Sequence, residues 1–259
     1  MRRAVRGSDP SINILSILGG YMITNRVKFA LAIVLLAASL GGCASTQNLK
    51  AQTASFDWSQ AQKKVLMVQP DIVLSELTAG GMTEPRADWT QTARTALATN
   101  FERFMAKKSV EAVALNELSD PHEIQLAKLH NAVGAAVLIH AFGPQKLPTK
   151  GTALDWTLGP GTSAMRDHYG TDYAMFVFVR DSYASAGRQA VIAGSIVLCA
   201  LTGVCPNIQG GTQVAFVSLV DLRTGNIVWF KFYASAAGDL RDGKNVGKFV
   251  NELLKDFPL

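Results

Sequence analysis

Cysteine, histidine and charge are all scarce in this sequence of 259 residues. It has three cysteines and four histidines, and 17% of its residues are Asp, Glu, Lys or Arg. A structural zinc site takes four Cys or His ligands, and no such cluster is visible, so we expect no metal site. Its two apolar runs, residues 29–40 and 190–204, are shorter than the ~20 residues that a membrane-spanning helix needs.

The first apolar run is typical of a cleavable secretory signal. Two basic residues precede its 12 residues, which lie within the usual length of about 7–15. Residues 40–43, Leu-Gly-Gly-Cys, then resemble a lipobox. The resemblance implies cleavage after Gly42 and acylation of Cys43, and two or more acyl chains make membrane attachment stable.

The signal also fixes the expected boundaries of the chain. Residues 1–42 are long for a signal of about 15–30 residues, so we expect translation to start at Met22 or residues 1–21 to be dispensable. Residues 43–62 are small and polar and predict a flexible tether. Residues 63–259 predict one periplasmic domain. Residue 44 is Ala and not Asp, which by the same resemblance favours the outer membrane over the inner.

Removal of the signal also removes most of the positive charge. Five of the 25 basic residues and one of the 20 acidic residues precede Cys43, so the net charge falls from +5 to +1. A nearly neutral chain lacks the excess of Lys and Arg that drives binding to nucleic acid, so we expect no nucleic-acid partner.

Alternating strand and helix patterns predict an α/β fold for the mature chain. Apolar runs predict strands, and apolar residues at helical spacing predict helices. The expected strands are 64–69, 110–115, 172–180, 214–220 and 227–232; the expected helices are 89–105, 119–142, 162–168 and 245–257. This order predicts a sandwich whose sheet is mainly parallel, with an antiparallel C-terminal hairpin and flanking helices.

The same residues resemble a family. Strand 64–69, a helix and a second strand, then Gly-Thr-Asp-Tyr at 170–173, are similar to the α/β domain of the TolB amino-terminal domain and CsgG-like envelope lipoproteins. The hairpin 217–229, with its Asp-x-x-Thr-Gly turn and Trp229, resembles their signature. The resemblance implies a non-enzymatic accessory or scaffold subunit, often oligomeric. The long helix 121–142 and the apolar block 187–205 depart from the family pattern.

The apolar block 187–205 has three interpretations. It is too short to span a bilayer. It could be a helix in the core of the domain, a contact with a partner or a second copy, or a segment that dips into the membrane interface beside the lipid. The partner interpretation predicts docking through residues 180–211. The expected interface residues are Arg180, Asp181, Tyr183, Arg188, Ile192, Ile196, Leu198 and Leu201.

Cys199 and Cys205 could form a disulfide in an oxidising compartment. Six residues of continuous helix rise about 9 Å, beyond the roughly 7 Å Cα separation that a disulfide allows. The bridge therefore requires the helix to break, and Gly203 could break it.

The candidate catalytic residues are Ser182 and Ser185 with His168. No Gly-x-Ser-x-Gly turn surrounds either serine, and the histidine lies across a strand from both, so a strand-exit loop is the simpler interpretation. An envelope hydrolase stays open as an alternative.

Three further patterns carry weaker signals. His122, His130 and His140 are spaced by 8 and 10 residues, which does not suit one metal ion, and we expect surface or capping roles. Gly-Pro-Gly at 159–161 lacks the Lys-Ser/Thr ending of a phosphate loop. Asp155 and Trp156 lie in a glycine-rich loop and could bind a glycan or another small molecule.

The sequence as a whole predicts a non-enzymatic, lipid-anchored accessory or scaffold subunit of an envelope assembly or export machine. We expect it to face the periplasm at the outer membrane and to use no cofactor. Its expected partners are the membrane, other envelope proteins and a second copy of itself.

Overall fold

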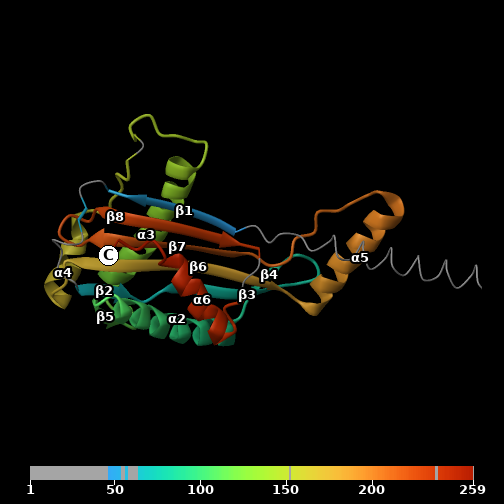
Figure 1. Ribbon diagram of the computed structural model, residues 1–259, viewed down its shortest axis with the longest axis horizontal. Coiled ribbons are helices and arrows are strands. Elements are labelled where there is room, and N and C mark those ends of the chain that lie inside the picture. The colour runs from blue at the N-terminus through green and yellow to red at the C-terminus, as the bar shows by residue number, and fades with distance from the viewer. Residues whose placement is uncertain (1–45, 54–55, 58–63, 152, 237–238, 259) are drawn as a thin grey trace, which may run out of the picture. The chain divides into compact units, whose positions relative to one another are not determined.

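The computed structural model describes residues 46–53, 56–57, 64–151, 153–236 and 239–258, which form a sheet covered on both faces (Figure 1). The expected signal, Met22, Gly42 and Cys43 lie outside the described residues. The sheet has the order β1-β8-β7-β6-β2-β5, and β3 and β4 extend it beside β6. The strands are β1 (Thr46–Gln52), β2 (Lys64–Val68), β3 (Asp71–Leu77), β4 (Thr83–Pro85), β5 (Glu111–Leu115), β6 (Tyr173–Ala184), β7 (Gln213–Asp221) and β8 (Ile227–Ser235).

Strand β6 organises the sheet because two shorter strands share one of its edges. β2 pairs with the start of β6, and β3 pairs with its end, both in parallel. Between β2 and β3 lies Pro70, which has no N–H group to donate to a ladder. One run of extended chain is thereby divided into two strands along the same neighbour.

The α/β class is confirmed, but the expectation of a mainly parallel sheet is wrong. Four of the seven strand pairings among the described residues are antiparallel. One reason is that the apolar block is not a crossover between parallel strands. It interrupts an antiparallel pair, β6 and β7, so the chain leaves the sheet and returns to the same end.

The expected tether is also wrong in part. Residues 46–52 form the edge strand β1, antiparallel to β8 from Thr46 opposite Ser235 to Gln52 opposite Trp229. Six of the seven residues of this strand are exposed, and five are polar. It therefore carries no apolar alternation, the signal by which a strand is recognised in a sequence.

Two separate cores lie on the two faces of the sheet. Helices α2 (Ala87–Lys107) and α6 (Gly243–Leu253) cover one face, where Phe101 and Val250 pack with alternate residues of β6 such as Val177. Helix α3 (Pro121–Val137), which continues as the π-helical turn η2 (Leu138–Phe142), covers the other face together with η3 (Pro160–Thr162) and α4 (Ser163–Tyr169). Successive side chains of β6 thus enter different cores.

The helix termini show how local sequence set the elements. Asp120 caps α3 by accepting hydrogen bonds from the backbone N–H groups of His122 (2.7 Å) and Glu123 (3.2 Å), and Pro121 occupies the first turn. Helix α2, by contrast, begins at Ala87 and has no side-chain cap.

Candidate functional site

Helix α5 (Ala186–Thr202) contains most of the apolar block 187–205, and no residue of this helix is buried. Figure 1 shows α5 lying beyond the end of the sheet, after β6 and before β7. Its apolar side chains reach high exposure, 57% for Val197 and 80% for Leu201. The block is therefore not part of this chain's core, which removes the first of its three interpretations.

The sequence makes α5 a helix by local signals alone. Ser185 caps it, accepting a hydrogen bond from the backbone N–H of Arg188 at 3.1 Å. The helix ends before Gly203, which has a φ of 73° in the left-handed region that glycine adopts most readily. Because little tertiary packing stabilises this helix, its caps contribute a larger share of its stability than the caps of a buried helix do.

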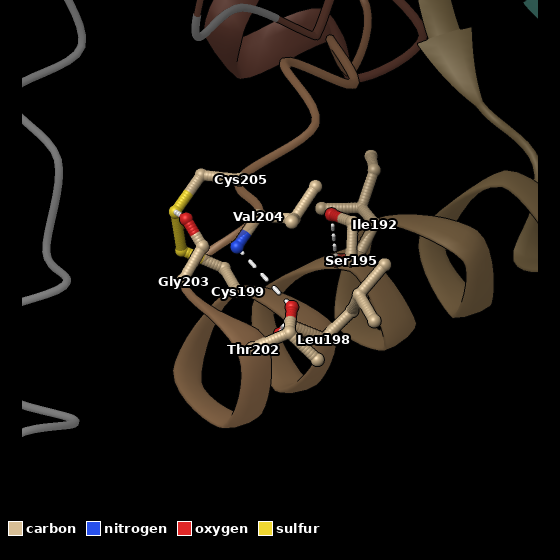
Figure 2. The surroundings of a disulfide bond; sticks show 8 residues. All are labelled: Ile192, Ser195, Leu198, Cys199, Thr202, Gly203, Val204 and Cys205. Atoms are coloured by element: carbon tan, nitrogen blue, oxygen red, sulfur yellow. Dashed lines mark hydrogen bonds between the residues drawn. A yellow bond between two sulfur atoms is a disulfide. The ribbon is translucent and has the colours of Figure 1, made fainter.

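A disulfide closes the outer end of α5 (Figure 2). The turn at Gly203 brings the Cα atoms of Cys199 and Cys205 to 4.3 Å, and the two sulfurs are bonded. Thr202 stabilises the same turn: its Oγ1 donates to the Leu198 carbonyl at 2.8 Å and accepts from the Val204 N–H at 3.2 Å. The helix and the first residues of the returning chain are thus joined at their tip.

Arg188 fastens the base of α5 to the returning chain. Its Nε donates to the carbonyl of Gln209 at 3.0 Å. At the sheet end below, Ser182 Oγ accepts from the Thr212 N–H at 3.0 Å. Helix α5 and the chain that returns from it to β7 are therefore held together at both ends, by hydrogen bonds at the base and by the disulfide at the tip.

Two of the expected interface residues are buried, and a third is held in an ion pair. Arg180 is bound to Asp71, with its guanidinium donating to the carboxylate at 2.8 Å. Asp181 is 3% exposed and Tyr183 is 7% exposed. Of the expected apolar residues, Ile196, Leu198 and Leu201 are exposed on α5, and Ile192 is half-buried on the same helix.

Asp181 and Tyr183 form a buried polar cluster that the sequence did not reveal. The Tyr183 hydroxyl donates to the Asp181 carboxylate, which also accepts from Gln213 Nε2 at 2.8 Å. The hydroxyl accepts from the Leu240 N–H at 2.6 Å, so the cluster ties the loop before α6 to the sheet. Burial raises the pKa of Asp181 to about 6, and burial beside this carboxylate raises the pKa of Tyr183. The sequence did contain one signal for this cluster: the carboxyl group of Asp181 occupies a position in the strand pattern whose alternate neighbours are apolar.

The serine–histidine combination expected as an alternative site does not assemble. His168 lies in α4 before the start of β6 and stacks on Tyr169, with ring centroids 4.4 Å apart. Ser182 is the ninth residue after Tyr173 along the strand, a span of roughly 30 Å at about 3.3 Å per residue. Ser185 is occupied as the cap of α5. His168 therefore cannot act as the base for either serine in this structure.

The three histidines of the α3 region have three separate roles. His122 Nε2 lies 2.9 Å from the carbonyl of Gly161, and His140 Nδ1 lies 2.7 Å from that of Gln145, so both are surface contacts. The expectation of a surface role is wrong for His130, which is 1% exposed and 2.9 Å from Ser218 Oγ. Burial lowers the pKa of His130 to about 4.

Asp155 and Trp156 do line a cavity, of about 590 Å³, together with Asp221, Arg223 and Asn226. The Trp156 backbone carbonyl accepts from the Ile227 N–H at 2.8 Å, which fixes the loop to β8. Lys150 Nζ lies 5.2 Å from the centre of the indole ring. The cavity combines an aromatic ring with charged and amide side chains, a lining suited to a polar small molecule.

Within the described part of the chain, no group of three or more His, Cys, Asp or Glu side chains could hold a metal ion. Across the same residues, no helix has the length and hydropathy needed to cross a bilayer.

Comparison with protein-family models and with curated proteins finds no match. Solved structures show distant similarity. The PelC dodecamer from Paraburkholderia phytofirmans has a TM-score of 0.38 and 10% identity over 81% of this chain and 95% of that one. Lipoprotein GNA1162 from Neisseria meningitidis has a TM-score of 0.30 and 12% identity, over 74% and 95%. The LpoB C-terminal domain from Salmonella enterica has a TM-score of 0.24 and 15% identity, over 70% and 86%. Similarities at this level establish neither a shared fold nor a shared function.

Proposed function

We propose that this chain is a lipid-anchored accessory subunit of a bacterial envelope assembly that faces the periplasm from the outer membrane and has no catalytic role. The observation that carries the proposal is the lipobox-like sequence ending at Cys43, followed three residues later by the edge strand of a folded domain. A lipid at Cys43 would hold the sheet directly against the bilayer, with no long linker between them.

The site geometry supports a contact role over a catalytic one. The serine and histidine residues that could have formed a nucleophilic site lie at opposite ends of β6. Among the described residues, α5 is the most exposed apolar element, and a contiguous exposed apolar surface usually marks an interaction site. The proposal therefore assigns contact with the envelope to α5.

Lipidation is the direct test. The full chain is expressed in a diderm bacterium, and the peptide that begins at Cys43 is analysed by mass spectrometry. We expect fatty acids on Cys43 and recovery of the protein in the outer-membrane fraction. Cys43→Ser should abolish both, whereas the control Cys199→Ser/Cys205→Ser should keep both. An unmodified Cys43, or a chain that stays in the cytosol, would contradict the proposal.

The cavity beside Trp156 favours a second candidate function, binding of a glycan or another polar small molecule. The test is titration of the purified protein with soluble peptidoglycan fragments, followed by tryptophan fluorescence. A saturable signal that is lost in Trp156→Phe and weakened in Asp155→Asn would support it. No change in either signal or thermal stability would contradict it.

A further inference from the structure

The segment around α5 has no charged side chain over a long stretch. No Asp, Glu, Lys, Arg or His lies between Arg188 and Asp221. The surface of α5 is thus apolar without the charged rim that normally keeps an exposed helix compatible with water. Such a surface needs an apolar medium or partner to cover it.

The exposed side chains of α5 surround most of the helix rather than forming one stripe. At 3.6 residues per turn, Val191, Ile196, Val197, Leu198 and Leu201 spread over more than half of its circumference. The remaining side, where Ile192 lies, faces the returning chain near Gly210. A groove in a partner protein covers one stripe of a helix, but a fluid acyl layer covers all the surface that the returning chain leaves open.

The strand register places α5 at the end of the sheet where the chain from Cys43 enters. Thr46 pairs with Ser235, Ser235 with Gln213, and Gln213 with Asp181, so these four residues form one row across the sheet. α5 leaves the sheet just after this row. At about 4.8 Å between strands, Thr46 is about 15 Å from Asp181 along the row.

The covalent chain limits how far a lipid at Cys43 could lie from this end. Thr46 is the third residue after Cys43 in the sequence, which gives a reach of at most about 10 Å. Helix α5 has 17 residues and is about 25 Å long at 1.5 Å per residue. A bilayer that holds the acyl chains of Cys43 is therefore within reach of α5.

We propose that α5 inserts its apolar surface into the boundary between headgroups and acyl chains of the bilayer that carries the lipid anchor. The inference rests on the lipid anchoring proposed above. At 17 residues α5 is too short to cross the bilayer, so it lies in the interface, where amphipathic helices are buried by about 5–10 Å. The disulfide at the tip links the last turn of the helix to the returning chain and prevents that end from unwinding. Lipid and helix together hold the sheet in one orientation, which a lipid alone cannot do.

Depth-dependent quenching tests the proposal on the full, lipidated protein. Leu201→Trp and Val204→Trp each place a tryptophan at the exposed tip, where the native side chains are 80% and 61% exposed. The proteins are reconstituted on vesicles of phosphatidylethanolamine and phosphatidylglycerol with brominated acyl chains. We expect the added emission to shift to the blue and to lose at least half of its intensity. Asp167→Trp, in α4 before the start of β6, is the matched control and should show neither change.

Two readouts separate failure of this inference from failure of the lipid anchor. Flotation of the vesicles reports anchoring, and quenching reports insertion. Vesicles that float with the protein while the tip tryptophans stay unquenched would overturn insertion and leave the lipoprotein proposal intact. Absence of flotation together with an unmodified Cys43 would overturn both. A photo-crosslinker at residue 201 that captures a protein and not lipid in intact envelopes would assign α5 to a protein partner and also overturn the inference.

Discussion

Gly134 lies directly against the ring of Phe216, so α3 and β7 approach more closely than a larger residue would allow. A β-carbon at position 134 would lie 2.2 Å from Phe216 Cε2. One turn earlier in α3, His130 contacts the same ring, with centroids 5.3 Å apart. This face of the sheet is therefore built around a glycine and a buried histidine.

We expect Gly134→Ala to destabilise the fold, because the new methyl group must displace either Phe216 or the helix. Overpacking of this kind costs about 1–3 kcal/mol in the free energy of unfolding, measured by urea denaturation. Gly194→Ala is the matched control, since a β-carbon there meets no atom within 4 Å. That exposed position in α5 should be neutral or gain stability. Equal effects at the two positions would contradict the close packing.

The pKa of His130 predicts a loss of stability in mild acid. The folded-state pKa of about 4 is below the ordinary histidine pKa of 6.5, so the unfolded chain binds a proton more readily as the pH falls below 6.5. At pH 5 this difference lowers the free energy of unfolding by about 2 kcal/mol relative to neutral pH. His130→Gln should not show this fall in the free energy of unfolding, because glutamine does not bind the proton. The measurement is urea unfolding of both proteins at pH 7 and pH 5, and the same change with pH in both would contradict the prediction.

The β7–β8 hairpin could be predicted from its two apolar runs, which are buried on both faces of the sheet, and helices α2 and α6 could be predicted because each buries one face. Their apolar residues recur with the period of the element, as Leu97 and Phe101 do in α2. The order of the strands could not be predicted, because the edge strand β1 is exposed and mostly polar, with Ala51 half-buried against the core.

The candidate site shows the same division. The apolar run of α5 was visible in the sequence, but core, partner and membrane select for the same composition, so only the structure showed the helix to be exposed. Arg180, Asp181 and Tyr183 were expected on the surface because they are polar. Asp181 and Tyr183 are instead buried. Their burial could not be predicted because their hydrogen-bond partners, Gln213 and the backbone of Leu240, are distant in sequence.

Asp181 predicts a change with pH opposite to that of His130. Its folded pKa of about 6 lies above the ordinary aspartate pKa of 3.8, so its ionisation destabilises the fold increasingly as the pH rises from 3.8 through 6. Asp181→Asn keeps an acceptor for Tyr183 and Gln213 without the buried charge. We expect the variant to be more stable than the wild type at pH 7, with the gain about 1 kcal/mol smaller at pH 5. Thermal and urea unfolding at both pH values measure it. A loss of stability at pH 7 would show that the charge is needed.

The ion pair of Lys231 and Asp256 predicts that substitutions of its two members lower the free energy of unfolding by different amounts. Lys231 is 2% exposed and donates to the Asp256 carboxylate at 2.6 Å, which lowers the pKa of Asp256. Asp256→Asn leaves the ammonium buried without a counter-charge, which costs about 3–5 kcal/mol in similar pairs. Lys231→Met replaces the buried charge with an apolar chain of similar length.

The carboxylate left behind in Lys231→Met is better placed than the ammonium left behind in Asp256→Asn. The Asp256 side chain is 33% exposed and still has Lys50 at 3.4 Å. We therefore expect Lys231→Met to lose clearly less stability than Asp256→Asn in urea unfolding at pH 7. Lys50→Met, which removes only the exposed partner, should cost at most about 1 kcal/mol. If Lys231→Met proved as costly as Asp256→Asn, the carboxylate and not the buried ammonium would be the group that depends on the pair.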